Sequence, residues 1–142
     1  MQRRILLTLF AATAMFGQQA AQKADAPKSK TLTRAELDTL LASPGSVLVI
    51  DVRRPDEQTT KGSFPVYLSI QAASLEKSLA FIPKDRTIVT VSNHAARGLK
   101  AADLLASHGF KVAGAIGVEN YEEQGGTLLK LAPPAPAATA KN

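Results

Sequence analysis

The sequence contains no cysteine and no tryptophan, and it has only two histidines among its 142 residues. Without cysteine the chain cannot form a disulfide framework, so a hydrophobic core must hold its fold together. The same absence removes every mechanism that depends on a thiol nucleophile. His94 and His108 alone do not make up a transition-metal site. We therefore expect no metal site and no cofactor.

The chain also lacks a concentrated basic pattern. It has 17 lysine and arginine residues against 12 aspartate and glutamate residues, and Arg3 and Arg4 lie close to the N-terminus. The other basic residues are scattered and are not interleaved with aromatic residues, whereas nucleic-acid-binding domains gather them on one face. We therefore expect no nucleic acid among its partners.

No apolar run is long enough to cross a membrane. The best candidate, residues 5–17, is uncharged and mostly apolar, and it follows the positively charged segment 1–4. A membrane-spanning helix needs about 20 apolar residues, so this pattern is typical of a secretory signal peptide instead. We expect cleavage between Gly17 and Ala26, export to the periplasm or secretion, and no permanent membrane span after signal removal.

Composition divides the chain into three parts. Residues 1–26 hold the predicted signal peptide and the start of a linker. Residues 131–142 form a tail rich in alanine and proline, which cannot bury apolar surface and is expected to be disordered. Residues 27–130 remain for one domain, which is long enough for a single hydrophobic core.

Helical and strand patterns alternate along residues 27–130. A capping box at Thr33–Glu36 predicts the first helix start, and Gly109 predicts the end of a later helix. Continuous apolar runs rich in β-branched residues indicate strands covered on both faces. The expected strands are 47–50, 66–70, 87–91 and 110–116, and the expected helical segments are 33–41, 74–81, the apolar set 99–106, and 120–124. This alternation predicts an α/β fold, a single domain with an open parallel sheet of four to five strands and helices on both faces.

One loop stands out in this arrangement, because ligands of open parallel sheets collect beyond the carboxyl ends of the strands. The segment that follows the strand 87–91 opens directly into a helix, so several backbone amides and the positive helix end could point at one spot. We call this segment the 92–97 loop and regard it as the candidate anion- or ligand-binding loop. It consists of Ser92, Asn93, His94, Ala95, Ala96 and Arg97.

Several motifs in the chain resemble those of rhodanese domains. The string Asp51-Val52-Arg53 at a strand end resembles the family's first signature, and residues 62–65 resemble its Gly-His-Ile-Pro segment. The family's active loop has six residues, beginning with the cysteine that carries a persulfide and ending with an arginine. The 92–97 loop matches this length and ends in Arg97, but Ser92 stands at the cysteine position. The resemblance implies the rhodanese fold and a sulfurtransferase ancestry, while a serine hydroxyl cannot become a persulfide.

Other positions depart from the family pattern as well. Ala95 stands where the family usually has a loop glycine, so the loop is strained or reshaped if that position needs a positive φ. Ser63 stands at the position of the motif histidine. We interpret Asp51, Arg53 and Glu57 as structural or pocket-lining residues. Arg97 has two interpretations: it binds an anion together with the loop amides, or it pairs with Asp51 or Glu57.

These residues favour a non-catalytic, exported rhodanese-like domain that binds a partner protein or a small oxyanion at the 92–97 loop. Two enzymatic alternatives stay open. One is a sulfurtransferase of the thiosulfate or persulfide type, retained in an unusual form. The other is a hydrolase that uses Ser92, for which His94 is the nearest base in the sequence although the two positions are poorly placed for a direct hydrogen bond. No catalytic residue is assigned from the sequence.

Overall fold

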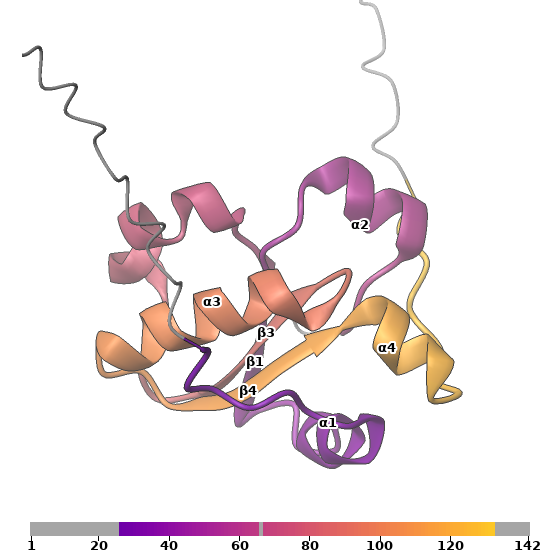
Figure 1. Cartoon of the computed structure of the whole chain (residues 1–142), viewed down its shortest axis with the longest axis horizontal. Coiled ribbons are helices and arrows are strands. Elements are labelled where there is room, and N and C mark those ends of the chain that lie inside the picture. Colours follow the sequence, from indigo (N-terminus) through magenta and orange to yellow (C-terminus); the bar gives the residue numbers. More distant parts are fainter. Residues whose placement is uncertain (1–25, 66, 133–142) are drawn as a thin grey trace, which may run out of the picture.

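In the computed structural model, residues 26–65 and 67–132 are described, and they form a parallel sheet covered by helices on both faces (Figure 1). The sheet has four strands in the order β2-β1-β3-β4, all parallel to their neighbours. The strands are β1 Val47–Asp51, β2 Tyr67–Ser69, β3 Thr87–Ser92 and β4 Val112–Gly117. The α-helices are α1 Arg34–Leu41, α2 Pro55–Lys61, α3 Ala95–Ser107 and α4 Val118–Glu123. The α/β prediction is therefore confirmed, with four strands.

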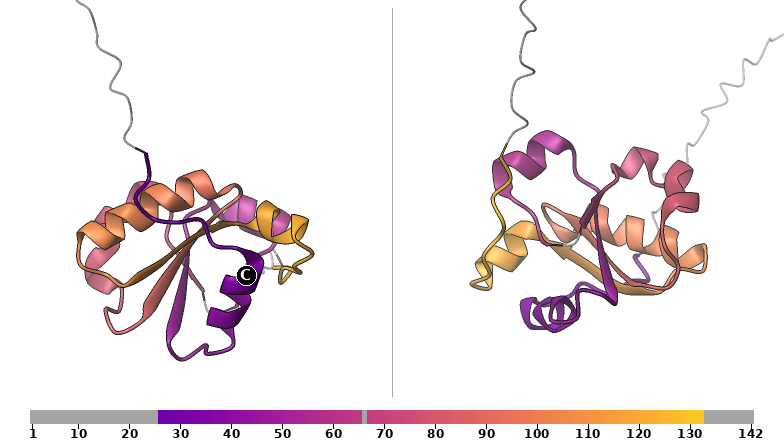
Figure 2. Two further views of the ribbon diagram at one scale, coloured as in Figure 1. Left: turned by 60° about the horizontal axis from the view of Figure 1, so that its bottom comes forward. Right: turned by 180° about the vertical axis from the view of Figure 1, so that it is seen from behind.

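Two hydrophobic clusters explain why the central strands are apolar on both faces. On one face, residues of α1 and α4 such as Leu37 and Val118 pack on Val49 of β1. On the other face, Leu105 of α3 and Leu75 pack on Ile50, the next residue of the same strand. Because successive side chains of a strand point to opposite faces, a continuous apolar run fills both cores at once. The views from below and behind show α1 and α3 on opposite sides of the sheet (Figure 2).

The helix ends follow the sequence signals. At the start of α1, the Thr33 side chain accepts a bond from the Glu36 amide while the Glu36 carboxylate accepts one from the Thr33 amide at 2.8 Å. This capping box satisfies amides that have no partner inside the helix. At the far end of α3, Gly109 has φ of +81° after the C-cap residue His108, as expected for a helix that ends on glycine.

Residues 74–81 do not form the predicted α-helix. They lie in two 3₁₀-helical segments, η1 Ala72–Ser74 and η2 Glu76–Phe81. The segment is held by hydrogen bonds between residues three positions apart, such as the one that the Ser78 amide donates to the Leu75 carbonyl. Pro83 follows soon after and disfavours a continued helix. Leu75 and Ile82 still face the core, whereas Phe81 is 82% exposed.

Several other boundaries differ from the prediction by one to four residues, and one helix was missed. The last strand begins at Val112 instead of Phe110, and the last helix spans Val118–Glu123 instead of 120–124. The helix α2 Pro55–Lys61 was not predicted, because its sequence is almost wholly polar and gives no apolar periodicity. Its proline at the first position and its acidic first turn were the available signals.

Two segments outside the named strands form isolated β-bridges near the two ends of the described chain. The Leu32 amide donates to the Ala115 carbonyl at 2.7 Å, and the Ala115 amide donates to the Lys30 carbonyl at 3.0 Å, so this segment covers the outer edge of β4. Leu129 forms an antiparallel bridge with Ser63. The predicted signal peptide and most of the predicted tail, residues 133–142, lie outside the described residues. No helix within the described part is long and apolar enough to cross a membrane.

Candidate functional site

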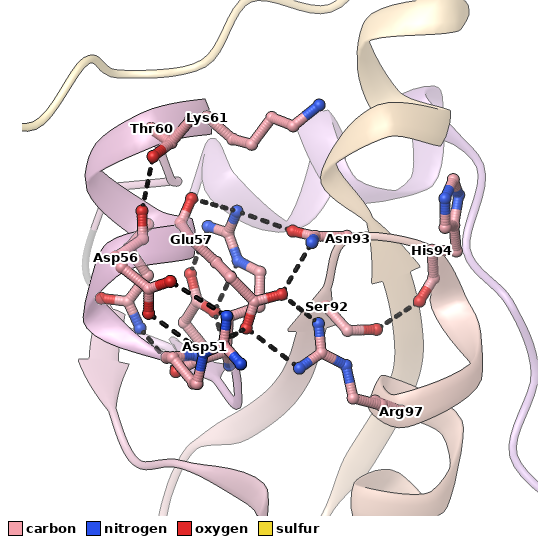
Figure 3. Close-up of polar contacts among 12 residues, drawn as sticks. Asp51, Asp56, Glu57, Thr60, Lys61, Ser92, Asn93, His94 and Arg97 are labelled. Carbon is pink, nitrogen blue, oxygen red and sulfur yellow. Dashed lines mark hydrogen bonds and ion pairs between the residues drawn. The ribbon is translucent and has the colours of Figure 1, made fainter.

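The 92–97 loop lies at the carboxyl edge of the sheet (Figure 3). Ser92 is the last residue of β3, and α3 already begins at Ala95. Only Asn93 and His94 therefore lie between strand and helix. The end of the neighbouring strand β1 brings Asp51 to the same edge. Hydrogen bonds from the loop to two other predicted site residues, Arg53 and Glu57, complete the group.

The Ser92 side chain is buried and fully engaged. Its hydroxyl donates to the main-chain carbonyl of His94 and accepts a bond from the Gly98 amide at 3.0 Å. The residue has no exposed surface. A nucleophilic serine needs a base beside its hydroxyl and a substrate in front of it. Here the proton of the hydroxyl is directed to a carbonyl inside the protein.

The imidazole of His94 points away from Ser92. Its Nε2 lies 3.0 Å from Oε2 of Glu119, and the other oxygen of that carboxylate lies 3.1 Å from Nζ of Lys61. The Lys61 hydrogen bond is the main cause that lowers the pKa of Glu119. Since the His94 side chain is 70% exposed, this is a surface contact between α4 and the loop. Ser92 and His94 therefore do not form a nucleophile–base pair.

Arg97 pairs with Glu57, one of the two partners that the sequence left open. Arg97 Nη2 lies 2.5 Å from Oε1 of Glu57, and Arg97 Nη1 lies 3.1 Å from Oε2. This bidentate ion pair connects α3 to α2. Asn93 Nδ2 donates to the same carboxylate at 2.8 Å. The hydrogen bond from Arg97 is the largest cause that lowers the pKa of Glu57 to about 2, and Glu57 in turn raises the pKa of Arg97.

Asp51 pairs with Arg53 instead. Nε and Nη2 of Arg53 donate to the two carboxylate oxygens of Asp51 at 2.9 and 2.7 Å, and neither side chain has exposed surface. Ser63, at the position of the family's motif histidine, donates to the same carboxylate at 2.7 Å, and Arg53 also donates to the Gly62 carbonyl at 2.6 Å. These bonds satisfy a charge pair that would be costly to bury without partners.

Asn93 joins the two ion pairs, a role that the sequence analysis missed. Its Oδ1 accepts a bond from Arg53 at 3.3 Å while its Nδ2 donates to Glu57. Its main-chain carbonyl also accepts a bond from the Glu119 amide at 3.1 Å, which ties the loop to α4. An asparagine amide carries a donor and an acceptor, and this was the only signal in the sequence for a bridging role.

Ala95 and Ala96 form the first turn of α3. Ala95 belongs to the α-helix, so this position does not place alanine in the left-handed region. Because α3 begins at Ala95, only two residues connect it to the end of β3. Among the described residues, no group of three or more histidine, cysteine, aspartate or glutamate side chains is arranged to hold a metal ion.

The fold matches solved structures, although no protein-family model and no curated protein matches the sequence. A rhodanese-related protein from Thermoplasma volcanium superposes with a TM-score of 0.63 and 20% identity, over 72% of this chain and 99% of that one. Thiosulfate sulfurtransferase from Pseudomonas aeruginosa gives a TM-score of 0.58 and 23% identity, over 70% of this chain and 20% of that one. A Rhodopseudomonas palustris protein described as a possible tyrosine phosphatase gives a TM-score of 0.63 and 26% identity, over 70% of this chain and 84% of that one.

The chain has a rhodanese-like fold. This finding confirms the resemblance inferred from residues 51–53, 62–65 and 92–97. It also confirms that a residue other than cysteine, Ser92, stands at the position of the family's active-site cysteine. A rhodanese-like domain without any cysteine has no thiolate to accept sulfur. In this rhodanese-like domain the hydroxyl of Ser92 has a structural task, because it links the end of β3 to the first turns of α3.

Proposed function

We propose that this chain is an exported rhodanese-like domain without catalytic activity, which binds a partner protein at the surface around the 92–97 loop. The observation that carries the proposal is the state of Ser92. Its side chain is fully buried and both of its hydrogen bonds are made inside the protein, to His94 and Gly98. A hydroxyl in this state neither carries sulfur nor faces a substrate.

The short connection between β3 and α3 favours a protein partner. Only two residues separate the strand from the helix, which leaves the exposed side chains of His94, Ala96 and Arg97 as the accessible part of the loop. Such a surface contacts another surface more readily than it encloses a small molecule, since ligand pockets are concave. Export rests on the sequence pattern of residues 1–17. Deleting these residues should retain the protein in the cytoplasm, as measured by cell fractionation.

A small oxyanion is the second candidate, and the Glu57 carboxylate is the observation that favours it. Arg97 and Asn93 direct three N–H groups at this carboxylate, which is the donor arrangement that an oxyanion needs. An external anion must displace Glu57 to use these donors. Titration with thiosulfate should therefore shift the NMR signals of Asn93 and Arg97 more strongly in Glu57→Gln than in the wild type.

Thiosulfate:cyanide sulfurtransferase activity tests the central claim. The wild type and Ser92→Cys should be assayed side by side for thiocyanate formation, and the wild type should not exceed the rate without protein. Activity in the wild type would contradict the proposal and support the sulfurtransferase alternative. Activity in Ser92→Cys alone would show that the loop still accommodates thiosulfate, and the oxyanion would become the leading ligand. If neither protein is active, a protein partner is favoured.

The hydrolase alternative has a separate test. A serine-reactive fluorophosphonate should leave the native wild type unlabelled, because the Ser92 hydroxyl is buried and donates to a carbonyl. Labelling that disappears in Ser92→Ala would support a hydrolase and contradict the non-catalytic proposal. Labelling that persists in Ser92→Ala would come from another residue and would not involve this site.

A further inference from the structure

A small cavity of about 260 Å³ lies between α3 and η1, next to the 92–97 loop. Its walls come from two segments that are distant in sequence: the start of the 3₁₀ region and one side of α3. The lining residues are Ala72, Leu75, Arg97, Lys100, Ala101 and Leu104. Arg97 belongs to both this cavity and the loop, so the cavity continues the surface described above.

The cavity has an apolar floor and a cationic rim. Leu75 and Ala101 are buried members of the hydrophobic cluster on this face, and Leu104 packs against that cluster. Arg97 and Lys100, which are both exposed, lie three positions apart on α3 and are therefore neighbours on one helix face. A ligand that fits must pair an apolar group with a negative charge.

The volume limits the size of that apolar group. Pockets for small-molecule ligands usually measure about 300–1,000 Å³, so this cavity lies below the usual range. It is suited to one aliphatic side chain. Single side chains buried in such pockets act as anchors of protein interfaces and supply much of their binding energy.

The positive charge on the rim is only partly neutralised within the described part of the chain. No carboxylate there forms an ion pair with Lys100. Arg97 pairs with Glu57, yet its side chain is still 44% exposed and its guanidinium carries further donors. The rim is therefore complementary to an additional carboxylate.

From this geometry we infer that the cavity between α3 and η1 receives a leucine-sized side chain of a partner protein, with an adjacent acidic residue of that partner contacting Lys100 and Arg97. The inference rests on the proposed function, because it assigns the chemistry of the partner that this domain binds. It names a short apolar-acidic peptide segment as the occupant. Neither a nucleic acid nor a large cofactor fits this description.

Titration of the ¹⁵N-labelled full chain with the peptide acetyl-Ala-Glu-Leu-Glu-Ala-amide tests the inference. We expect amide shifts confined to η1 and the first half of α3, with a dissociation constant on the order of 100 µM. Two matched peptides separate the contributions. Replacing leucine by alanine, or both glutamates by glutamine, should weaken binding about ten-fold and about five-fold, respectively.

Variants of the protein locate the site. Ala72→Phe fills the cavity from an exposed position and should weaken binding about ten-fold, and Lys100→Glu should weaken it about five-fold. Their controls are Ala73→Phe, which adds the same group one residue away, and Lys111→Glu, which makes the same charge change before β4. Both controls should bind the peptide as the wild type does. The NMR spectra also show whether each variant is folded.

Two outcomes would overturn the inference. One is the absence of shifts at about 1 mM peptide, and the other is that Ala72→Phe and Lys100→Glu both bind the peptide as strongly as the wild type does. Either result leaves the non-catalytic proposal standing, because that proposal is decided by the sulfurtransferase assay. Sulfurtransferase activity of the wild type would overturn the proposed function whatever the peptide does.

Discussion

Two arginine–carboxylate pairs lie at the same edge of the sheet, and they differ mainly in burial. The pair Asp51–Arg53 has no exposed surface and sits among bonds from the protein interior. The pair Glu57–Arg97 has similar two-pronged geometry, but the Arg97 side chain is 44% exposed and that of Glu57 is 14% exposed. Asn93 contacts both pairs. Two similar ion pairs, one buried and one partly exposed, are thus connected through the side chain of Asn93.

Because the two pairs differ in burial, they contribute differently to the stability of the fold. A buried charge that loses its partner has no water to replace it, so each member of the inner pair depends on the other. At the outer pair, water and salt compete with the ion pair and limit its contribution to stability. The inner pair therefore fixes the architecture of the edge, while the outer pair is accessible to solvent. This difference is why our proposal assigns binding to Arg97 and not to Arg53.

Arg53→Met should give the largest effect. The substitution keeps an elongated side chain but leaves the buried Asp51 carboxylate without its charged partner, and we expect the free energy of unfolding to fall by about 3–5 kcal/mol. Urea denaturation followed by circular dichroism measures this change. The double variant Asp51→Leu, Arg53→Met removes both charges and should recover part of the loss. A loss below about 1 kcal/mol in the single variant would contradict the structural role of this pair.

Arg97→Met should give a much smaller effect at the outer pair. Glu57 keeps its bond from Asn93 and gains water, so we expect the free energy of unfolding to fall by about 1 kcal/mol or less. The same denaturation experiment measures it, with Arg53→Met as the matched substitution. If the two variants were equally unstable, burial would not be the property that separates the pairs.

The sequence was sufficient for the fold because its signals are local and repeated. The apolar run of β1 and the capping box at Thr33 each report on their own segment, and several such segments in order specify a parallel sheet. The helix α2 Pro55–Lys61 was missed, since its polar sequence has no apolar period. Residues 74–81 were predicted as one α-helix from their apolar spacing, but they lie in the 3₁₀ region. Their conformations depend on tertiary contacts and on Pro83.

At the site, the sequence could name the participants but not their pairing. Arg97 had two candidate carboxylates, and the choice between them depends on how α2 is placed against α3. Because α2 was missed, its placement could not be inferred. Asn93 was part of the predicted loop, but its contacts reach 36 and 40 residues along the chain. No local pattern predicts such contacts.

The smallest expected effect is on the pH dependence of unfolding, and it tests the outer pair Glu57–Arg97 directly. Glu57 has a pKa of about 2 in the folded protein against an ordinary value of 4.5, chiefly because Arg97 donates hydrogen bonds to its ionised form. A lowered folded-state pKa gives stability that is complete above pH 4.5 and is lost as the pH falls from 4.5 towards 2. Glu57→Gln lacks this contribution.

The wild type should therefore be more stable than Glu57→Gln by up to about 1 kcal/mol at neutral pH, and the difference should shrink towards pH 2–3. Urea denaturation of both proteins across this pH range measures it, and comparing the two cancels the titration of other carboxylates. In an Arg97→Met background the same substitution should lose most of its pH dependence, since the cause of the lowered pKa is gone. Parallel stability curves for the wild type and Glu57→Gln would mean that Arg97 does not hold this carboxylate in solution. The outer pair would then already be open, and its guanidinium would be available to an external carboxylate without any exchange.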